Sequence, residues 1–595
     1  MATSTGGDGR GPSPLPERLS RILTERNFLA CLTVAFIAMT VWVGTVPYDP
    51  MRDIADATTN VIWSEYYRDG EFAVPYAQWK ADGRPMTQSS VVLLDGEPWV
   101  VNEKGPAHAL IELVLGPATG TVLAAVGVAA TYMLGRRLFG WQVGAIASVV
   151  VLTNLTTIAL WYRHMWVDAS TMPLLALSMW LFVESVARMR ADIGAHARGG
   201  PMPAVVLGAC GGLAFGVAIA TRYTVGVVLL AVLVYVLALY WRPLAESLRG
   251  RDARLLARTA GRAMLLLLPF ILGMLVVLLP LMHYNATYFG GPLHSGYDAT
   301  SLMDYERSRG VIDARNQTEQ LFMDPLDKVE NIVHNTFTLA PLILSRMLAL
   351  VFVPYGVWRL RRDPSMWLLL PWAATIMVGF LAIEWIDMYS RALDVVWEPR
   401  YHLPALPAIA LMAGVALRRA GEGSAGPVAA GGHPRGSAAL ALTVVVMIAL
   451  SGVLPAEANF AEVRSSGVPT EQGGQQQQPA DKPTVVVVAR LYAEAVQLQD
   501  RPVELHGGHV VSVQRAGGTG PVVAFQLRDA SSPLNLTVRL VDFPPGTTPD
   551  LRTGQNVSVF GLSAWPDPDG DGVVDPGEPL VRIRSGTPDR VVIEA

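Results

Sequence analysis

Long apolar stretches recur between residues 28 and 455. Each approaches the ~20 residues that an α-helix needs to cross the hydrocarbon core of a bilayer. No small-x-small cleavage pattern closes the first stretch, which indicates an uncleaved span rather than a removed signal peptide. We therefore predict a multi-pass α-helical membrane domain over residues 28–456, with about eleven spans at 28–46, 107–134, 141–161, 169–187, 203–220, 223–241, 263–282, 333–357, 366–383, 401–417 and 437–455.

Basic residues mark alternate connections between these spans. Arginines lie at 136–137, 188–190, 242–262, 359–362 and 418–419. Because short cytoplasmic loops retain Lys and Arg, we expect these connections and the N-terminal head, residues 1–27, in the cytoplasm. The opposite connections, which include the loops 47–106, 283–332 and 384–400, are then expected on the outer face of the cell membrane.

The pattern changes after the last span. Residues 457–483 are rich in Gly, Gln and Pro, which predicts a flexible linker. From residue 484 to residue 595, short β-branched runs alternate apolar with polar positions and are interrupted by Gly, Pro and Asp. This predicts a small extracytoplasmic all-β domain of the barrel type.

Composition agrees with a bilayer as the main solvent, since 51% of the residues are hydrophobic and only 16% are charged. The net charge of −4 offers no global basic surface, so we exclude nucleic acid as a partner. The two cysteines, Cys31 and Cys210, cannot build a disulfide framework or a cysteine metal site. Both lie in apolar runs, and we expect them to be small buried hydrophobic side chains.

Ionisable residues gather at the predicted outer ends of the spans. A lone charge there usually only anchors its helix, and the tryptophans and histidines nearby are typical of an interfacial belt. The convergence of acids and cations on one face, however, favours a functional site, because charge near the membrane is costly without a role or a partner. The residues concerned are Asp53 and Asp56 after the first span, Glu103, Lys104 and His108 before the second, Arg163, His164 and Asp168 before the fourth, and His294, Tyr297, Glu398, Arg400, Tyr401 and His402 in the later loops.

Two of these groups suit specific chemistry. Asp53 and Asp56 are three residues apart, so they share one face if the segment is helical, and a carboxylate there can act as a general base. The Lys104 ammonium lies at headgroup level, where it can meet a lipid phosphate.

Four segments resemble the GT-C superfamily of polytopic glycosyltransferases, in particular its aminoarabinose-transferase and protein O-mannosyltransferase-like members. In chain order they are the acidic segment ending in DGEFAVPY, the NEKGP segment that is similar to a family E-K-P element, Asp168 at the start of the fourth span, and PRYHLPALP, which is similar to R-Y-x-L-P-x-x-P. The resemblance covers about residues 28–455. It implies transfer of a sugar, with inversion, from a polyprenyl-phosphate donor to a hydroxyl of a protein or glycolipid acceptor.

The resemblance also implies roles for residues. Asp53 or Asp56 would be the base; the family often has an adjacent acidic pair, whereas Ile54 follows Asp53, and a gapless match back from Gly70 favours Asp56. Lys104 and Arg400, with Tyr401 beside it, would hold the leaving phosphate, and Asp168 would contribute to the acceptor or sugar pocket. Some relatives hold a divalent metal that would map onto Glu103 and His294, although two ligands do not complete a site.

The tail, over about residues 500–562, resembles the OB-fold of the periplasmic haem chaperone. No histidine lies near the C-terminus, so haem binding is not carried over. Residues 567–578 have the spacing of a calcium loop, with Gly572 at the sharp turn. An acidic hairpin is the alternative. The expected ligands of a structural Ca²⁺ ion are Asp567, Asp569, Asp571, Val573, Asp575 and Glu578.

Two other functions remain open. A transporter or lipid flippase also needs many spans, and a calcium-stabilised accessory domain fits it equally well. Such proteins keep polar or broken-helix sites near the bilayer midplane, whereas the charges here lie at the outer ends of the spans. The third possibility is a membrane-anchored scaffold whose barrel recruits a partner.

Overall fold

The computed structural model describes the chain in segments. These are residues 24–48, 50, 55–85, 90–93, 98–195, 202–296, 300–301, 329, 332–333, 335–337, 343–344, 347–382, 399–422 and 435–465, and the strand segments 484–486, 502–515, 522–528, 536–541, 556–564, 580–584 and 590–593. The chain divides into two units, Met1–Glu306 with Gly310–Pro469, and Arg307–Arg309 with Thr470–Ala595.

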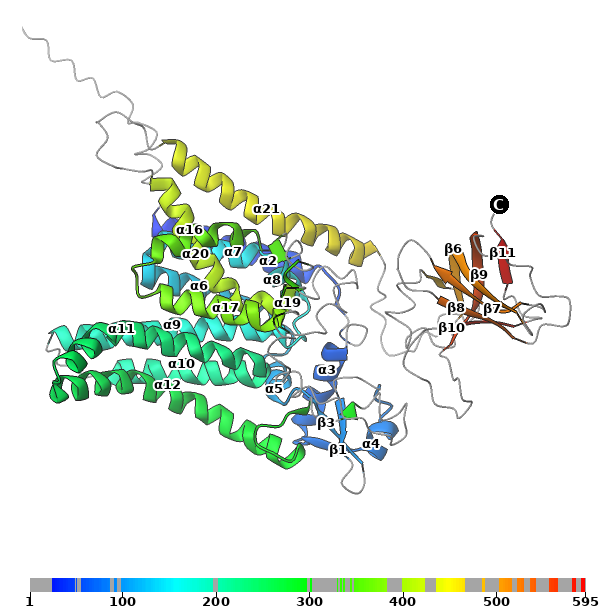
Figure 1. Ribbon diagram of the computed structural model, residues 1–595, viewed down its shortest axis with the longest axis horizontal. Coiled ribbons are helices and arrows are strands. Elements are labelled where there is room, and N and C mark those ends of the chain that lie inside the picture. The colour runs from blue at the N-terminus through cyan, green and yellow to red at the C-terminus, as the bar shows by residue number, and fades with distance from the viewer. Residues whose placement is uncertain are drawn as a thin grey trace, which may run out of the picture. The chain divides into compact units, whose positions relative to one another are not determined.

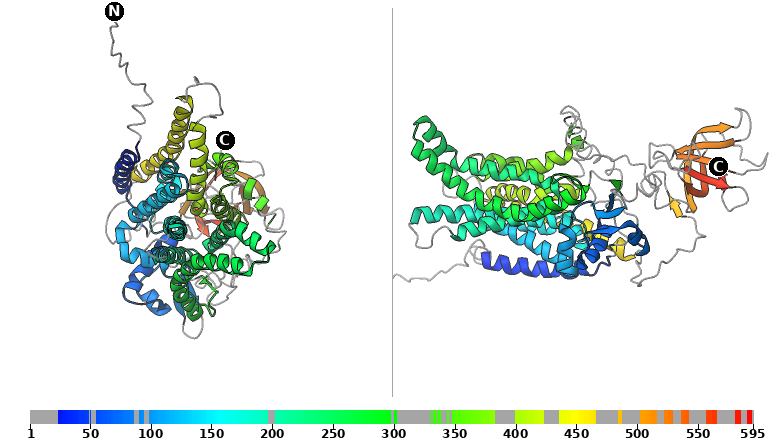
Figure 2. Two further views of the ribbon diagram at one scale, coloured as in Figure 1. Left: turned by 90° about the vertical axis from the view of Figure 1, so that its left-hand side faces the viewer. Right: turned by 90° about the horizontal axis from the view of Figure 1, so that it is seen from below.

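The first unit is a bundle of long helices lying side by side (Figures 1 and 2). Its helices are α2 (Glu25–Gly44), α6 (Thr119–Phe139), α7 (Trp141–Thr153), α8 (Leu155–Tyr162), α9 (Asp168–Ala195), α10 (Met202–Thr221), α11 (Leu229–Arg249), α12 (Ala253–Tyr288), α16 (Val353–Leu360), α17 (Met366–Leu381), α20 (Leu406–Glu422) and α21 (Arg435–Ser465).

Seven of the described helices are long and apolar enough to cross a membrane, and the number is eight if the bent pair α7 and α8 is one span. Three shorter apolar helices, Leu348–Leu360, Met366–Leu381 and Leu442–Ala458, lie beside them. The chain is therefore a multi-pass membrane protein.

Two predicted spans are broken. The span predicted at 107–134 consists of α5 (Ala107–Leu115), a 3-10 turn η2 (Gly116–Ala118) and α6, because Gly116 adopts φ 54° and Pro117 follows it. The span predicted at 141–161 bends by 56° between α7 and α8. Asn154 lies at this bend, and its side chain accepts hydrogen bonds from the first amides of α8.

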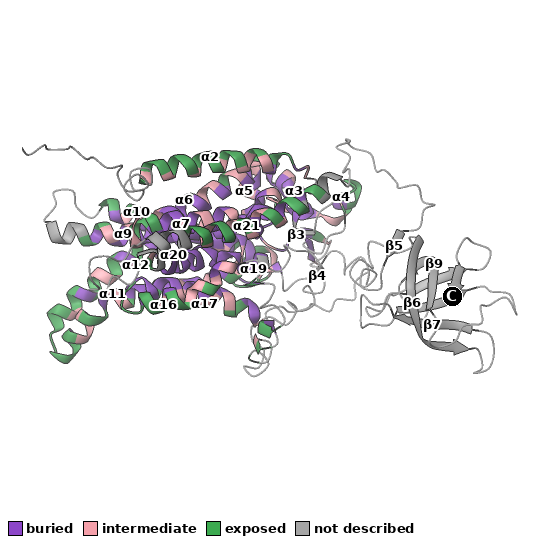
Figure 3. Ribbon diagram, turned by 90° about the horizontal axis from the view of Figure 1, so that it is seen from above, coloured by how far each residue is buried: buried purple, intermediate pink, exposed green. Residues whose placement is uncertain are grey.

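Two further expectations from the sequence differ from the structure. The last helix, α21, does not end near residue 456 but continues to Ser465, because Glu457 accepts a hydrogen bond from Trp42 and Phe460 packs on the same indole ring. Cys31 and Cys210 are exposed rather than buried. Cys31 lies on α2, a peripheral helix of which only Val43 is buried (Figure 3).

Helices α10 and α12 approach closely through glycine. A Cβ atom on Gly212 would lie 1.8 Å from the Phe270 carbonyl oxygen, and one on Gly273 would lie 2.0 Å from the Ala209 carbonyl oxygen. Small residues at such crossings let membrane helices pack backbone to backbone. The close contact fixes the end of α10, where Arg222 follows Thr221.

One end of the bundle carries a small α/β layer, and we call it the sheet end (Figure 1). It contains α3 (Ala55–Arg68), α4 (Tyr76–Ala81) and an antiparallel sheet in the order β1-β3-β2-β4. The strands are β1 (Ala73–Pro75), β2 (Ser90–Leu93), β3 (Trp99–Asn102) and β4 (Thr300–Ser301). Trp63 and Trp79 are fully buried between α3 and the sheet, so this layer has its own apolar core.

The described strands of the second unit form one sheet in the order β11-β9-β10-β8-β7-β6-β5, and β9 also pairs with β6. This extra pairing closes β6, β7, β8, β10 and β9 into a ring. The strands are β5 (Thr484–Val486), β6 (Pro502–Arg515), β7 (Val522–Arg528), β8 (Leu536–Val541), β9 (Asn556–Ala564), β10 (Leu580–Arg584) and β11 (Arg590–Ile593). The predicted calcium loop, 567–578, lies outside the described residues.

Candidate functional site

Asp168 is the centre of the site at the sheet end. It is the first residue of α9, follows the turn 163–167, and is 1% exposed. Its carboxylate forms ion pairs with Arg222, just after α10, and with Arg400 in α19 (Pro399–His402), whose Nε lies 3.4 Å from Oδ2. A buried carboxylate is stable only when paired in this way, so three segments that are distant in sequence are bound together here.

Aromatic rings flank the two guanidinium groups. The Arg400 guanidinium lies 4.5 Å from the Trp166 ring centroid and donates to the Tyr401 hydroxyl at 2.9 Å. The Arg222 guanidinium lies 4.4 Å from the Tyr401 ring centroid. Cation–π contacts and ion pairs together restrict both arginines to one orientation.

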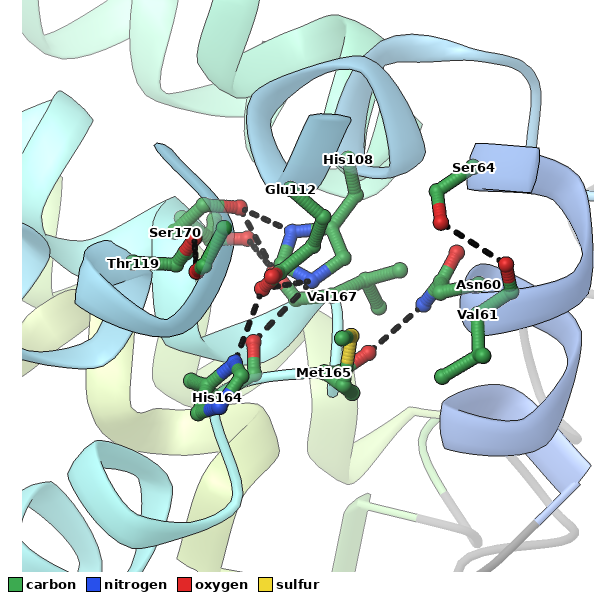
Figure 4. Close-up of polar contacts among 12 residues, drawn as sticks. Asn60, Val61, Ser64, His108, Glu112, Thr119, His164, Met165, Val167 and Ser170 are labelled. Atoms are coloured by element: carbon green, nitrogen blue, oxygen red, sulfur yellow. Dashed lines mark hydrogen bonds and ion pairs between the residues drawn. The ribbon is translucent and has the colours of Figure 1, made fainter. Parts of the chain in front are cut away.

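A second polar cluster lies next to this site and joins α5 to α9 (Figure 4). Glu112 accepts a hydrogen bond from His164 Nδ1 at 3.2 Å. His108, one helical turn before Glu112, faces the His164 carbonyl oxygen with Nε2 at 3.2 Å and Ser170 Oγ with Nδ1 at 3.0 Å. Because a carbonyl only accepts, His108 Nε2 is the donor in the first contact. His108, Glu112 and Ser170 are all buried.

Helix α3 docks onto the same turn. Asn60 is 2% exposed, and its amide donates to the Met165 carbonyl oxygen at 2.7 Å (Figure 4). Asp56 lies four residues before Asn60, on the same face of α3. The backbone of α3 therefore brings the position of Asp56, a candidate base, to the face that meets the turn before Asp168. Asp53, the other candidate, lies outside the described residues.

Glu103 and Lys104 follow β3 and lie among tyrosines. Glu103 is 9% exposed, and the Lys104 amide donates to the Asn102 side chain at 3.1 Å. Gly105 adopts φ 75°, and a Cβ atom there would lie 3.2 Å from the Tyr223 hydroxyl. The chain therefore passes directly over Tyr223, in a conformation that favours glycine.

The segment that contains His294 approaches Glu103. A Cβ atom on Gly296 would lie 2.3 Å from the Glu103 Cα atom, so the two backbones are in contact. The His294 ring itself is exposed and lies 3.2 Å from the Phe289 carbonyl oxygen. Among the residues that the structure describes, no group of three or more His, Cys, Asp or Glu side chains is arranged to hold a metal ion.

Some of the residues that the sequence predicted for the site are in contact in the structure. Asp168, Arg400 and Tyr401 lie together, and Lys104 lies at the same end of the helical unit, the sheet end. Arg222 and Glu112 belong to these polar clusters but were not among the predicted site residues. Arg222 is a lone cation between two predicted spans, a signal that the sequence contains, whereas nothing in the sequence indicates that Glu112 meets His164. Tyr297, Glu398 and the calcium-loop residues lie outside the described part of the chain.

No protein-family model and no curated protein sequence matches the chain. Among solved structures it is similar to two GT-C glycosyltransferases. One is ArnT from Cupriavidus metallidurans bound to undecaprenyl phosphate, with 15% identity, 74% of this chain and 72% of ArnT covered, and a TM-score of 0.37. The other is the archaeal oligosaccharyltransferase AglB from Archaeoglobus fulgidus in complex with an inhibitory peptide and a dolichol-phosphate, with 12% identity, 79% of this chain and 59% of AglB covered, and a TM-score of 0.41. Likeness at this level assigns no activity to the chain.

Proposed function

We propose that this protein is a membrane glycosyltransferase that moves a sugar from a polyprenyl-phosphate donor to a hydroxyl acceptor on a protein or glycolipid. One observation carries the proposal: a buried carboxylate, Asp168, orients two arginines at the end of a membrane bundle, beside a turn onto which the helix of a candidate base docks. The proposed reaction needs a fixed cationic group for a phosphate, for which Arg400 is the candidate, and a carboxylate for a hydroxyl proton, for which Asp56 or Asp53 is the candidate.

Arg400, assisted by Lys104, binds the phosphate of the donor in this proposal. A guanidinium can donate two parallel hydrogen bonds to phosphate oxygens, and its planar face is held here against Trp166. When the bond between the anomeric carbon and the phosphate oxygen breaks, negative charge grows on the phosphate. A cation already oriented toward that oxygen stabilises the transition state more than the ground state.

Asp56 is the proposed general base, with Asp53 as the second candidate. The carboxylate takes the proton of the acceptor hydroxyl while the oxygen attacks the anomeric carbon from the face opposite the phosphate. A single displacement of this kind inverts the anomeric configuration. Polyprenyl phosphate leaves, so no nucleotide site is required.

The membrane topology is part of the same proposal. Eleven spans put the N-terminus in the cytoplasm and the sheet end on the extracytoplasmic face of the cell membrane. A transporter is disfavoured, because Asp168 and the two arginines lie at the ends of their helices rather than at mid-span.

Two metal sites also remain proposals. One is a divalent ion near Glu103 and His294. The other is a structural Ca²⁺ ion in the loop 567–578 of the tail, which we propose to be an OB-type all-β domain that assists acceptor binding.

The test is a transfer assay with purified protein, radiolabelled polyprenyl-phosphate sugars and hydroxyl acceptors. Asp56→Asn is expected to lower kcat by about 10²–10⁴-fold, the usual contribution of a general base. Arg400→Ala is expected to lower kcat as strongly, and Arg400→Lys to recover only part, since an ammonium cannot form the two-point contact.

Matched controls are Asp69→Asn, at the exposed end of α3, and Arg359→Ala, on α16. Both should retain parental kcat. If the parent transfers no sugar from any polyprenyl-phosphate donor and instead moves lipid across vesicles, the proposed function is wrong. If Asp53→Asn, and not Asp56→Asn, abolishes transfer, the base is reassigned and the rest stands.

A further inference from the structure

The cluster of His108, Glu112, His164 and Ser170 takes no part in the chemistry proposed above, yet it is costly to maintain. The Glu112 side chain is 1% exposed, and among the described residues its Oε2 atom has no hydrogen-bond partner. Burying an acid without complete pairing lowers stability. Such a residue, in a helix whose only other polar side chain is His108, calls for a compensating role.

The cluster holds the turn 163–167. His108 contacts the carbonyl oxygen of His164, and Glu112 contacts its ring. Asn60 donates to the Met165 carbonyl oxygen from the other side (Figure 4). Helix α6 closes a further side, since a Cβ atom on Gly120 would lie 2.2 Å from the Trp161 carbonyl oxygen and 3.0 Å from His164 Cβ. The turn is therefore fixed by α3, α5 and α6 together.

This turn carries the residues that orient the arginines. Trp166, which is fully buried, directly follows Met165 in the turn and lies against the Arg400 guanidinium, and Asp168 directly follows Val167. A shift of the turn would move the ring and the carboxylate at once. A misplacement of about 1 Å far from the reacting bond can lower a rate by about 10²-fold.

We propose that Glu112 and His108 are positioning residues, which hold the turn 163–167 in the arrangement that aligns Arg400 with the donor phosphate. The proposal rests on the proposed function for the identity of the bound group. It assigns no contact between Glu112 and the substrate. Its effect is expected in kcat rather than in the KM for the acceptor, because alignment of the leaving phosphate matters most in the transition state.

The kinetic test compares three variants. Glu112→Ala removes the acceptor for His164 Nδ1 and is expected to lower kcat by about 30–100-fold with little change in acceptor KM. Glu112→Gln keeps an acceptor oxygen and should recover most of this loss. The control is Glu184→Gln in the second half of α9, which breaks ion pairs with Arg137 and Arg188 and should leave kcat unchanged.

A merely structural role gives a different result. It would reduce the amount of folded protein, measured by thermal unfolding, but leave kcat per folded molecule at the parental value for both Glu112 variants. That outcome, or an equal loss in Glu112→Gln and Glu112→Ala, would overturn the proposal.

A second measurement does not depend on sugar transfer. Cys31→Ser and Cys210→Ser remove the native thiols, and Val167→Cys then places one thiol in the turn, where the native side chain is 3% exposed. Maleimide labelling should be slow in this background, because buried thiols are protected. Adding Glu112→Ala should speed it by about tenfold or more, whereas Glu184→Gln should not.

The two readouts separate the two proposals. Faster labelling with no transfer by the parent would refute the proposed function and leave the positioning of the turn supported. Parental labelling together with parental kcat in Glu112→Ala would refute the positioning role while the transferase proposal stands.

Discussion

Tyr66 and Tyr67 are neighbours on α3 whose hydroxyl groups have different surroundings. Tyr66 donates a hydrogen bond to Asp82 at 2.7 Å, and the Arg84 guanidinium lies 5.2 Å from its ring centroid. Burial, with the Asp82 carboxylate as the second cause, raises the pKa of Tyr66 to about 12. Burial also raises the pKa of Tyr67. Both hydroxyls are therefore protonated at neutral pH.

The raised pKa of Tyr66 predicts a loss of stability in strong base. Because the folded-state pKa exceeds the value of about 10 in an unfolded chain, the fold favours the protonated hydroxyl. This contribution is complete below about pH 10 and is lost as the pH rises toward 12. Asp82→Asn should move the ionisation of Tyr66 to lower pH, measured as phenolate absorbance by difference from Tyr66→Phe. Asp69→Asn is the control, and an unchanged midpoint in Asp82→Asn would contradict the assignment.

Single residues differ in how far the sequence alone reveals their role. Asp168 and Arg400 stand out because each is a charge at the end of an apolar run. Glu112 is also a charge in an apolar run, but its meaning depends on His164, 52 residues later. No spacing rule connects two residues so far apart, so only the packing of α5 against the turn discloses the pair.

Among the helices, the crossing of α10 and α12 depends on glycines in register. Gly208, Gly212 and Gly216 are four residues apart along α10 and all face α12 neighbours, namely Pro269, Phe270 and Met274. The spacing of four places them on one side of a helix. The same crossing holds α10 in place, and Arg222 directly follows the last residue of this helix.

Gly273→Ala is expected to destabilise the protein. The new methyl group has no space against the Ala209 backbone, so the two helices must separate, and overpacking of this kind costs about 1–3 kcal/mol. Gly261→Ala, on the same helix, meets nothing within 4 Å and should leave the thermal unfolding temperature equal or slightly higher. Equal behaviour of the two variants in thermal unfolding would argue against the close crossing.

Helix type and approximate position followed from hydropathy, but breaks in the helices did not. A twenty-residue apolar window has the same mean hydropathy whether the helix is straight or bent. The bends depend on Gly116 with Pro117 and on the capping of α8 by Asn154, local features that an averaged pattern conceals. The extension of α21 to Ser465 was missed for a related reason, since its last turns are polar and are held by Trp42 and Phe460 contacts.

At the scale of the whole molecule, the division of the chain near residue 470 separates a helical unit from a β unit. Every described residue of the candidate site belongs to the helical unit. The tail is therefore not expected to supply a group to the reaction centre, and domains with separate cores can usually fold independently.

A chain that ends at Pro469 should keep a transfer rate to a simple acceptor within about threefold of the full-length protein. A chain that ends at Ala456 is the contrasting variant, because it also loses the Trp42–Glu457 hydrogen bond and the Phe460 ring. It should unfold at lower temperature. Complete loss of transfer in the well-folded Pro469 variant would favour the scaffold hypothesis instead.

The ion pairs of Asp168 have a consequence for how the proposed site is loaded. Arg222 and Arg400 share a counter-ion that the protein itself carries, so neither guanidinium has to be stripped of its partner when the lipid departs. An incoming phosphate then competes with the Asp168 carboxylate for the guanidinium donors, and when the phosphate leaves, both arginines still have a counter-ion that the protein carries.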